Sequence, residues 1–463
     1  MANTRLIRTN TTATNAKKGT ISVWIKRARI AHEQAIISAL SSSSDRWQIR
    51  FKADDTIDCE LGLSGSWYSL ITNRKFRDIN AWYHLCLSYD TTQGTASDRA
   101  SFYINGVQQT SFSTANYPPQ DSLIYLFANA DTQSIGCNTS DDSTFSNHFD
   151  GCMSHLHIID GTKYAASAFG STDATTGEWK INTSPSVTYG NNGTFILQDS
   201  NSVTDQSGQS NNFVVHDNTL TKTEDNPSNN FATMNTLGTY DGSMANGNTS
   251  VTTDQTNYRY IASTLGVNKG KWYWEVKLKT QANYMLCGIT DQPSFPNSGI
   301  TMLGNGTYDC AVYTGNLTAG GGNGHLYHSS TSNADNTNTP GAFMGGLGTN
   351  DIITFALDLD SATKKLYVGV GGNWANGSGS TNQTFGNASG VTIVAPSSTN
   401  TGFYFPACGD YSGTNGTFEY NFGNGYFGTT AVSSAGTNAS NLGIFELDVP
   451  SGYTALCTKG LNE

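Results

Sequence analysis

Charged residues are scarce in this chain of 463 residues. Asp, Glu, Lys and Arg together make up 13% of it, against roughly 25% in average globular proteins. The balance is acidic, with 25 Lys and Arg against 36 Asp and Glu, which gives a net charge of −11. Because phosphate backbones repel such a chain, we do not expect it to bind nucleic acid.

Long apolar runs are also missing. The sequence has no stretch of about 18 apolar residues, so we expect no insertion into a membrane. Residues 1–5 lack the apolar segment of a secretory signal peptide. Export by that route is therefore not expected.

Cysteine pairs at metal-binding spacing are absent as well. None of the 8 cysteines forms a Cys-x-x-Cys pair, which excludes clusters of the zinc-finger type. Several, such as Cys86, lie inside apolar runs, so we expect buried free thiols that pack as small apolar groups. A disulfide between Cys137 and Cys152 stays open as an alternative, because the two are near each other in the sequence.

Glycine and aromatic residues are plentiful. The chain has 49 Gly, and its 22 Tyr, 21 Phe and 8 Trp make up 11% of the sequence. Turn-forming residues between short aromatic and β-branched runs favour many short strands with polar loops. The aromatic rings supply enough apolar area for a substantial core. At this length we expect two sandwich-sized domains.

The first part of the chain contains a series of strand-like runs. Apolar and aromatic residues occupy both alternating faces of residues 82–89, which is typical of a strand buried between two layers. The Asn-Gly pair at 105–106 predicts a hairpin. Residues 28–40 depart from this pattern, because the spacing of Ile30, Gln34 and Ile37 also fits a short helix.

These runs together resemble the laminin G-like, concanavalin A-like jelly roll. The matching segments are Ser-Val-Trp-Ile at 22–25, Trp-Tyr-His-Leu at 82–85, Phe-Tyr-Ile-Asn-Gly at 102–106 and Phe-Asp-Gly-Cys-Met at 149–153. The resemblance covers residues 1–165. It implies a β-sandwich, in which residues 28–40 would not be helical.

Residues 166–240 are rich in turn formers, and we expect them to form a polar connector. One short strand, at residues 194–197, interrupts this segment. A partly ordered strap is favoured over a flexible linker, because several apolar side chains would be costly to leave in water. These are Phe195, Ile196, Phe213, Val214 and Val215.

Residues 241–463 contain a second set of strands. Trp272 and Trp274 alternate with Tyr273 and Glu275, and residues 351–360 followed by 364–368 predict a hairpin. With Phe-Glu-Tyr-Asn-Phe-Gly at 418–423, these runs resemble the SPRY domain, a β-sandwich used for binding. The resemblance departs from the family at 371–373 and in the Gly/Asn-rich loop at 314–349. We therefore predict an all-β chain of two antiparallel sandwiches joined by a polar connector.

A wider resemblance includes the connector and the C-terminus. Asn-Asn-Phe-Ala-Thr at 229–233 and residues 445–459 resemble a group of tailed-bacteriophage virion proteins that join a laminin G-like domain to a SPRY domain. This resemblance implies a tail or head fibre or appendage on the virion, made in the host cytoplasm. Its implied partners are other virion proteins and a host cell-surface glycan or lipopolysaccharide. Analogy with phage fibres implies a homo-oligomer, a trimer.

Motifs for catalysis are sparse. Concanavalin-type jelly rolls include glycan hydrolases, whose two carboxyl groups lie about 5–5.5 Å or about 6.5–9.5 Å apart. Residues i and i+2 of one strand can meet this requirement. The closest such pairs are Asp358 with Asp360, which ends a strand at a turn, and Asp58 with Glu60. The Asp58–Glu60 pair lacks the third acidic residue of the glucanase motif. We therefore expect no enzyme, with a glycan depolymerase as the outside alternative.

Aromatic residues in polar loops are the expected ligand-binding residues. Sugar recognition uses aromatic ring faces flanked by amide and hydroxyl groups. The alternative for each of these rings is a structural role, in which it packs against the core. An uncharged polar surface also suits a capsid decoration protein with no receptor of its own, which is the main alternative function. The candidates are Trp67, Tyr68, Tyr313, Tyr327, Trp374 and Tyr411.

No cofactor is implied, although calcium is an open question because laminin G-like domains often carry it. Calcium takes several oxygen ligands from Asp, Asn and backbone carbonyls. Asp141, Asp142 and Asn147 could supply them. Asp and Asn are so common in this chain that such clusters also arise by chance.

Overall fold

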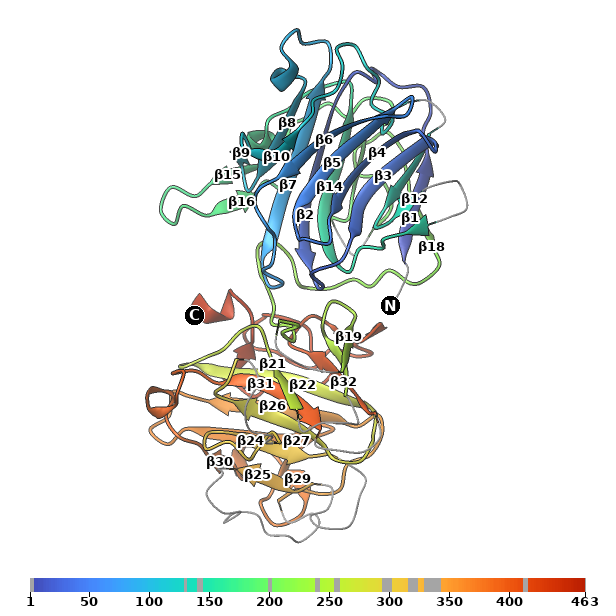
Figure 1. The fold of residues 1–463 in the computed structure, drawn as a ribbon. Helices are drawn as coiled ribbons and strands as arrows, with labels where there is room; N and C mark the ends of the chain where they lie inside the picture. Colours follow the sequence, from blue (N-terminus) through green and yellow to red (C-terminus); the bar gives the residue numbers. More distant parts are fainter. Residues whose placement is uncertain are drawn as a thin grey trace. The chain divides into compact units, whose positions relative to one another are not determined.

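The structure is a computed structural model that describes residues 4–128, 131–139, 145–198, 202–237, 242–253, 259–293, 302–314, 324–328, 343–410 and 415–462. The chain divides into two compact units, residues 1–222 with 226–228, and residues 223–225 with 229–463. Both units are built from strands, and no α-helix occurs among the described residues (Figure 1). The helical turns there are η1 (Ala96–Asp98), η2 (Ala166–Ala168), η3 (Phe385–Asn387), η4 (Pro396–Ser398) and η5 (Gly460–Asn462).

The described part of the first unit contains two antiparallel sheets, of eight and six strands. The eight-stranded sheet runs in the order β10 (Phe112–Ala115), β6 (Ser66–Thr72), β5 (Ile57–Leu63), β4 (Asp45–Phe51), β3 (Gln34–Ser42), β11 (Thr132–Ile135), β1 (Arg5–Thr9) and β18 (Val214–His216). The six-stranded sheet runs in the order β17 (Thr194–Ile196), β14 (Gly151–Asp160), β2 (Lys18–Arg27), β7 (Trp82–Asp90), β8 (Ala100–Ile104) and β9 (Val107–Gln108). Two short pairs accompany them, β12 (Asn138–Thr139) with β13 (Phe145–Ser146) and β15 (Gly170–Thr172) with β16 (Trp179–Ile181).

The core of this unit lies between the two sheets. Alternate residues of each strand face it, as the two-residue period of a strand requires. Trp47 and Ile49 from the eight-stranded sheet share one buried cluster with Val23 and Leu85 from the six-stranded sheet. The predicted hairpin at 105–106 joins β8 to β9, with positive φ at both Asn105 and Gly106.

The structure corrects the helical interpretation of residues 28–40, because residues 34–42 form strand β3. It also places residues 166–222, which were expected in the connector, in the first unit. The predicted strand at 194–197 is β17, which pairs with β14. Phe195, Ile196 and Phe213 are buried as expected, but Val214 is exposed.

The second unit is also an antiparallel sandwich. Its larger sheet runs in the order β19 (Ser243–Ala245), β20 (Ser250–Thr252), β32 (Thr417–Asn421), β22 (Lys271–Thr280), β26 (Ile352–Asp358), β27 (Lys365–Val370), β28 (Asn373–Ala375) and β29 (Thr381–Gln383), with β30 (Val391–Thr392) on β27 and β35 (Thr454–Ala455) parallel to β22. The smaller sheet runs in the order β21 (Arg259–Ala262), β31 (Phe405–Asp410), β23 (Met285–Thr290), β24 (Cys310–Tyr313) and β25 (Leu326–His328). A further pair is β33 (Tyr426–Phe427) with β34 (Thr430–Ala431).

Strand β22 has the predicted alternation. Trp272 and Trp274 belong to the core cluster between the two sheets, whereas Tyr273 lies in a second cluster on the opposite face. That second cluster contains Phe445 and Cys457, so the C-terminal segment packs over this face of β22. Phe231, from the expected connector, is buried in the same cluster. All eight cysteines are free, and seven of them are buried.

Candidate functional site

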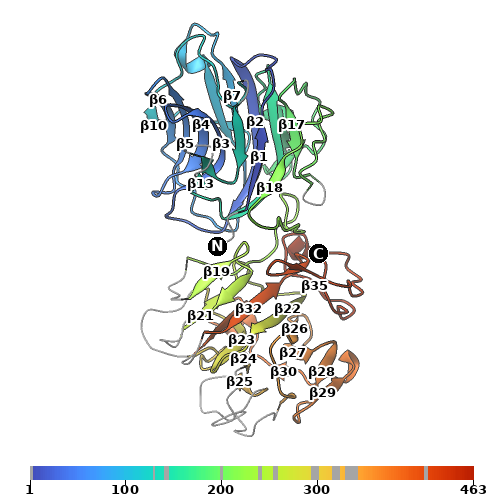
Figure 2. The same cartoon turned by 90° about the vertical axis from the view of Figure 1, so that its right-hand side faces the viewer.

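Strand β4 carries an alternation of apolar and polar side chains. Trp47, Ile49 and Phe51 point into the core of the first unit. Arg46 and Arg50 therefore lie on the outer face of the eight-stranded sheet. The neighbouring strands β5 and β6 lie beside β4 at one side of this unit (Figure 2).

Strand register arranges this outer face in three rows. Each row crosses β6, β5 and β4, because directly opposed residues of neighbouring strands share a face. We call this surface the Trp67 face. Its rows are Trp67–Gly62–Arg46, Ser69–Glu60–Gln48 and Ile71–Asp58–Arg50.

The indole of Trp67 lies across β5 above Gly62. A Cβ atom at Gly62 would stand 2.5 Å from Cζ3 of Trp67, so the ring can occupy this place only because position 62 is glycine. The guanidinium carbon of Arg46 lies 4.4 Å from the ring centroid, within cation–π distance. Trp67 nevertheless keeps 41% of its surface exposed.

An ionic network occupies the other two rows. Glu60 accepts from Arg46 at 3.2 Å, from Gln48 Nε2 at 2.6 Å and from Arg50 at 3.0 Å. Arg50 also donates to Asp58 at 3.1 Å. Burial raises the pKa of Asp58, and Arg50 opposes that shift. Burial alone would lower the pKa of Arg50, but Glu60 and Asp58 raise it overall.

The network leaves several hydrogen-bonding atoms unused. Gln48 Oε1 and Asp58 Oδ1 are buried acceptors without a partner in the described structure, and the Nε atoms of Arg46 and Arg50 are buried donors without one. Buried polar atoms are normally paired with protein or ordered water. The Trp67 face therefore combines an exposed ring with donors and acceptors that this chain does not satisfy by itself.

The predicted ligand-binding aromatics do not gather at one place. Trp67 lies on the Trp67 face, but Tyr68 points the opposite way and packs against the core. Tyr313, Tyr327 and Trp374 are strand residues with exposures of 2%, 8% and 4%, so the expectation of rings on loop surfaces is corrected for them. Tyr411 lies outside the described residues.

Of the three predicted calcium ligands, the structure describes only Asn147. Asp141 and Asp142 lie outside the described residues. Asn147 donates from Nδ2 to Glu33 at 3.3 Å, and its carbonyl accepts from the amide of Ala35. Among the residues that are described, no three His, Cys, Asp or Glu side chains cluster in a way that could hold a metal ion.

Asp58 and Glu60, the acidic pair considered for catalysis, both form ion pairs with Arg50 in this network. Nη2 of Arg50 bonds to Asp58 and Glu60 together, at 3.1 Å and 3.0 Å. A general acid must carry a proton that it can transfer to the leaving oxygen. Arg50 opposes the rise that burial causes in the pKa of Asp58, and its guanidinium occupies an oxygen of each carboxylate.

A serine–histidine pair that the sequence did not reveal lies in the six-stranded sheet. Ser22 Oγ is 2.8 Å from Nε2 of His84, and Trp179 Nε1 is 3.0 Å from His84 Nδ1. An indole N–H only donates, so Nδ1 accepts and Nε2 carries the proton. His84 then donates to Ser22 and cannot activate it, and burial lowers the pKa of His84 to about 3. The Ser22–His84 pair is therefore a buried structural hydrogen bond and not a catalytic pair.

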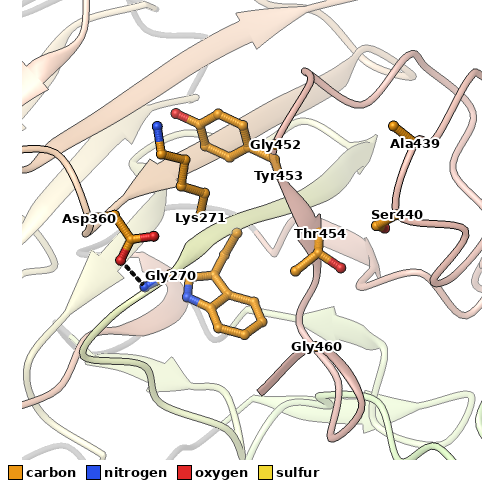
Figure 3. A pocket seen from close by; sticks show the side chains of 10 residues that line it. Gly270, Lys271, Asp360, Ala439, Ser440, Gly452, Tyr453, Thr454 and Gly460 are labelled. Atoms are coloured by element: carbon orange, nitrogen blue, oxygen red, sulfur yellow. Dashed lines mark hydrogen bonds between the residues drawn. The ribbon is translucent and has the colours of Figure 1, made fainter. Parts of the chain in front are cut away.

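A depression of about 340 Å³ lies in the second unit, between the start of β22 and the C-terminal segment (Figure 3). Lys271, Asp360, Ser440 and Thr454 line it. Its charges are already engaged, because Lys271 pairs with Asp358 at 3.0 Å and Asp360 accepts from the amide of Gly270 at 2.7 Å. It offers less ring surface than the Trp67 face, since Trp272 and Tyr453 are both buried.

Sequence reasoning missed Arg46, Gln48, Arg50 and Gly62. The alternation Arg-Trp-Gln-Ile-Arg-Phe at 46–51 was the available signal, because every second residue is polar in an otherwise apolar strand. No sequence pattern of this kind predicts the contact between Gly62 and Trp67. It depends on the β5–β6 register.

The chain is thus an all-β protein of two antiparallel sandwiches, the first of which presents a polar face with an exposed aromatic ring. Residues 2–167 match the family model described as the concanavalin A-like lectin/glucanases superfamily. No curated protein matches the chain. Among the described residues, none of the helical segments has the length and apolar character needed to cross a bilayer.

Several solved structures resemble parts of the chain. A heptameric SAP-like pentraxin from Limulus polyphemus is 18% identical, with a TM-score of 0.32, over 47% of this chain and 87% of the pentraxin. The SPRY domain of human HERC1 is 14% identical, with a TM-score of 0.29, over 40% of this chain and 96% of the domain. Domains LG4-5 of the mouse laminin α1 chain are 8% identical, with a TM-score of 0.28, over 98% of this chain and 84% of theirs.

Proposed function

We propose that this protein binds carbohydrate without cleaving it, and that the Trp67 face is the binding surface. The observation that carries the proposal is the exposed indole of Trp67, which lies over Gly62 beside the network of Arg46 and Glu60. The match of residues 2–167 to a family model that includes lectins supports it.

The chemistry of a sugar fits this arrangement. A pyranose has an apolar C–H face that stacks on an aromatic ring and a rim of hydroxyls that need both donors and acceptors. Trp67 offers the ring. Arg46 in the same row and Glu60 in the next row offer guanidinium and carboxylate groups. Gln48 is fully buried and holds Glu60 through a hydrogen bond of 2.6 Å.

The absence of catalysis is part of the proposal. Arg50 bridges Asp58 and Glu60, which leaves neither carboxyl group arranged as a proton donor. Assays for new reducing ends on the glycans that the protein binds test this point. Release of sugar that disappears in Asp58→Asn or Glu60→Gln would instead make the protein a depolymerase.

The biological setting that we propose is the surface of a tailed-phage virion. The protein would be a tail or head appendage, made in the host cytoplasm and assembled as a homotrimer with other virion proteins, that attaches to host glycan or lipopolysaccharide. The Asn-Asn-Phe-Ala-Thr run at 229–233 and the C-terminal segment carry the resemblance that supports this setting. Immunolabelling of purified particles tests it: label on a tail or head appendage supports it, and a uniformly labelled shell favours the decoration protein.

Glycan-array binding by the full chain tests the function. We expect binding to a subset of glycans that falls at least about tenfold in Trp67→Ala. Phe403→Ala is the matched control, because Phe403 is a similarly exposed aromatic in the second unit. Equal binding by both variants would remove the Trp67 face as the site, and no binding by the wild-type chain to any glycan would contradict the function.

A further inference from the structure

The charges on the Trp67 face are balanced by neighbours on the face itself. The two guanidiniums, Arg46 and Arg50, meet three carboxylates, Asp58, Glu60 and Glu33. Their N–O distances are 3.0–3.2 Å to Glu60 and Asp58, and 3.9 Å to Glu33. Each cation beside Trp67 is therefore already neutralised.

We propose that the Trp67 face takes a neutral saccharide and discriminates against glycans that carry carboxylate, sulfate or phosphate groups. This inference rests on the proposed function, because it names the class of sugar that the same surface binds. It follows from the charge balance and from the partial burial of the ion pairs.

Among the described residues, an anionic sugar meets no guanidinium beside Trp67 that is free of a carboxylate partner. To pair with Arg46 or Arg50 it would have to displace Glu60 or Asp58, whose side chains are only 10% and 2% exposed. Removing one partner of a buried ion pair leaves the other charge uncompensated, which is costly. The net charge of −11 adds a general repulsion of polyanions.

A neutral sugar meets no such penalty. Its hydroxyl groups can donate to carboxylate oxygens and accept from guanidinium N–H groups while the ion pairs stay intact. The unused atoms in the network include the acceptors Gln48 Oε1 and Asp58 Oδ1. Both atoms are buried and lack a donor, which a sugar hydroxyl can supply through a water molecule.

Titration of the full chain with neutral and acidic polysaccharides of matched length tests the inference. Dextran and galactan are the neutral probes, and alginate and polygalacturonate are the acidic ones. We expect Trp67-dependent binding to at least one neutral probe, at least about tenfold tighter than to either acidic probe. Because the recognition is not ionic, the affinity should change less than about twofold when the salt concentration is raised tenfold.

Charge variants make the test sharper. Glu60→Gln removes the only carboxylate partner that the described residues provide for Arg46, while Arg50 keeps Asp58. It should gain acidic-probe affinity by about tenfold, whereas Glu178→Gln, which makes the same charge change at an exposed site far along the sequence, should not. Glu33→Gln is the second variant, because the side chain of Glu33 is 40% exposed and we expect its replacement to preserve the fold. It should gain acidic-probe affinity less strongly.

The outcomes separate the two proposals. Salt-sensitive, Trp67-dependent binding of alginate or polygalacturonate by the wild-type chain would overturn the neutral-sugar inference and leave carbohydrate binding standing. A Glu60→Gln variant that folds and gains no acidic-probe affinity would also contradict the charge argument. Failure of every probe, neutral and acidic, would instead contradict the proposed function.

Discussion

Gly62 is the residue on which the geometry of the Trp67 face depends most closely. Any side chain there would meet the indole, since a Cβ would lie 2.5 Å from Cζ3 of Trp67. A ring pushed off the strand would no longer present the same face to a sugar.

We therefore expect Gly62→Ala to weaken glycan binding about tenfold while the melting temperature falls by only a few degrees, because the displaced ring is partly exposed already. Gly94→Ala is the control, since a Cβ there meets nothing within 4 Å. Isothermal titration paired with thermal melts checks both. Unchanged affinity in folded Gly62→Ala would mean that the ring position does not matter.

Glu275 is the residue whose ionisation should matter most for the second unit. It is fully buried, and its carboxylate accepts from the amides of Glu446 and Leu447, from Asn421 Nδ2 and from the hydroxyl of Tyr273. Burial raises its pKa to about 7, against the hydrogen bonds that lower it. The folded state therefore holds this proton more tightly than the unfolded state does.

Raising the pH should therefore destabilise the second unit. The contribution of Glu275 is fully present below its ordinary pKa of 4.5 and is lost as the pH rises through about 7. We expect the free energy of unfolding of the second unit to fall by up to about 3 kcal/mol over this range from this group. Urea unfolding at several pH values should show this dependence in the wild type and a smaller one in Glu275→Gln. Identical pH profiles would contradict the buried, proton-holding state.

At the scale of elements, the β15–β16 hairpin is an integral part of the first unit, although it lies in the segment expected to be a connector. Trp179 of β16 donates to His84 of β7 and stacks on its ring at 5.8 Å. The same indole packs over Gly106 and Gly170, where a Cβ would clash with it. The hairpin thus covers part of the outer face of the six-stranded sheet.

Trp179→Ala should accordingly destabilise the first unit by about 2–3 kcal/mol, through lost ring contacts and an unpaired His84 Nδ1. Trp67→Ala is the matched control and should cost less than about 1 kcal/mol, because Trp67 is 41% exposed and its indole forms no hydrogen bond to a buried group in the described part of the chain. Denaturant unfolding measures both. A Trp179→Ala variant as stable as Trp67→Ala would show the hairpin to be a loose appendage.

Strands could be predicted from the sequence where residues alternate regularly between the two faces of the strand. Strand β22 alternates regularly from Trp272 to Leu278, before its register shifts at the end of the strand, and the faces of Trp272, Tyr273 and Trp274 were assigned correctly from the sequence. Strand β3 was ambiguous because its register shifts between Ala35 and Ile37. A bulge interrupts the two-residue period there, and the resulting apolar run imitates a helical spacing until the neighbouring strands are known.

The candidate site was only partly predictable, for a similar reason. The exposed ring of Trp67 and the acidic pair on β5 were visible in the sequence, but their meeting with Arg46 and Arg50 depends on the β4–β5–β6 register. Tyr313 and Tyr327 looked like loop residues because Gly and Asn lie close to them. They pack instead with Leu286 and Ala407 in a buried cluster, which only the pairing of distant strands creates.

At the scale of the whole molecule, the two units should unfold separately. Each has its own core between its own pair of sheets, and the division of the chain falls between residues 222 and 229. Domains with separate cores can fold alone.

We expect calorimetry of the full chain to show two transitions, one of which a fragment of residues 1–222 reproduces. That fragment should keep the full glycan affinity, whereas a fragment of residues 223–463 should have none. A fragment 1–222 that is unfolded, or folded without binding, would mean that the first unit does not act alone.

The most direct test of carbohydrate binding is a structure of the full chain in complex with the neutral saccharide that binds most tightly. The account predicts a sugar ring stacked on the indole of Trp67, with hydroxyls hydrogen-bonded to the Arg46–Glu60–Gln48 network and both ion pairs of Arg50 intact. A sugar seated in the depression around Lys271, or one bound only after Arg46 or Arg50 has left its carboxylates, would contradict it.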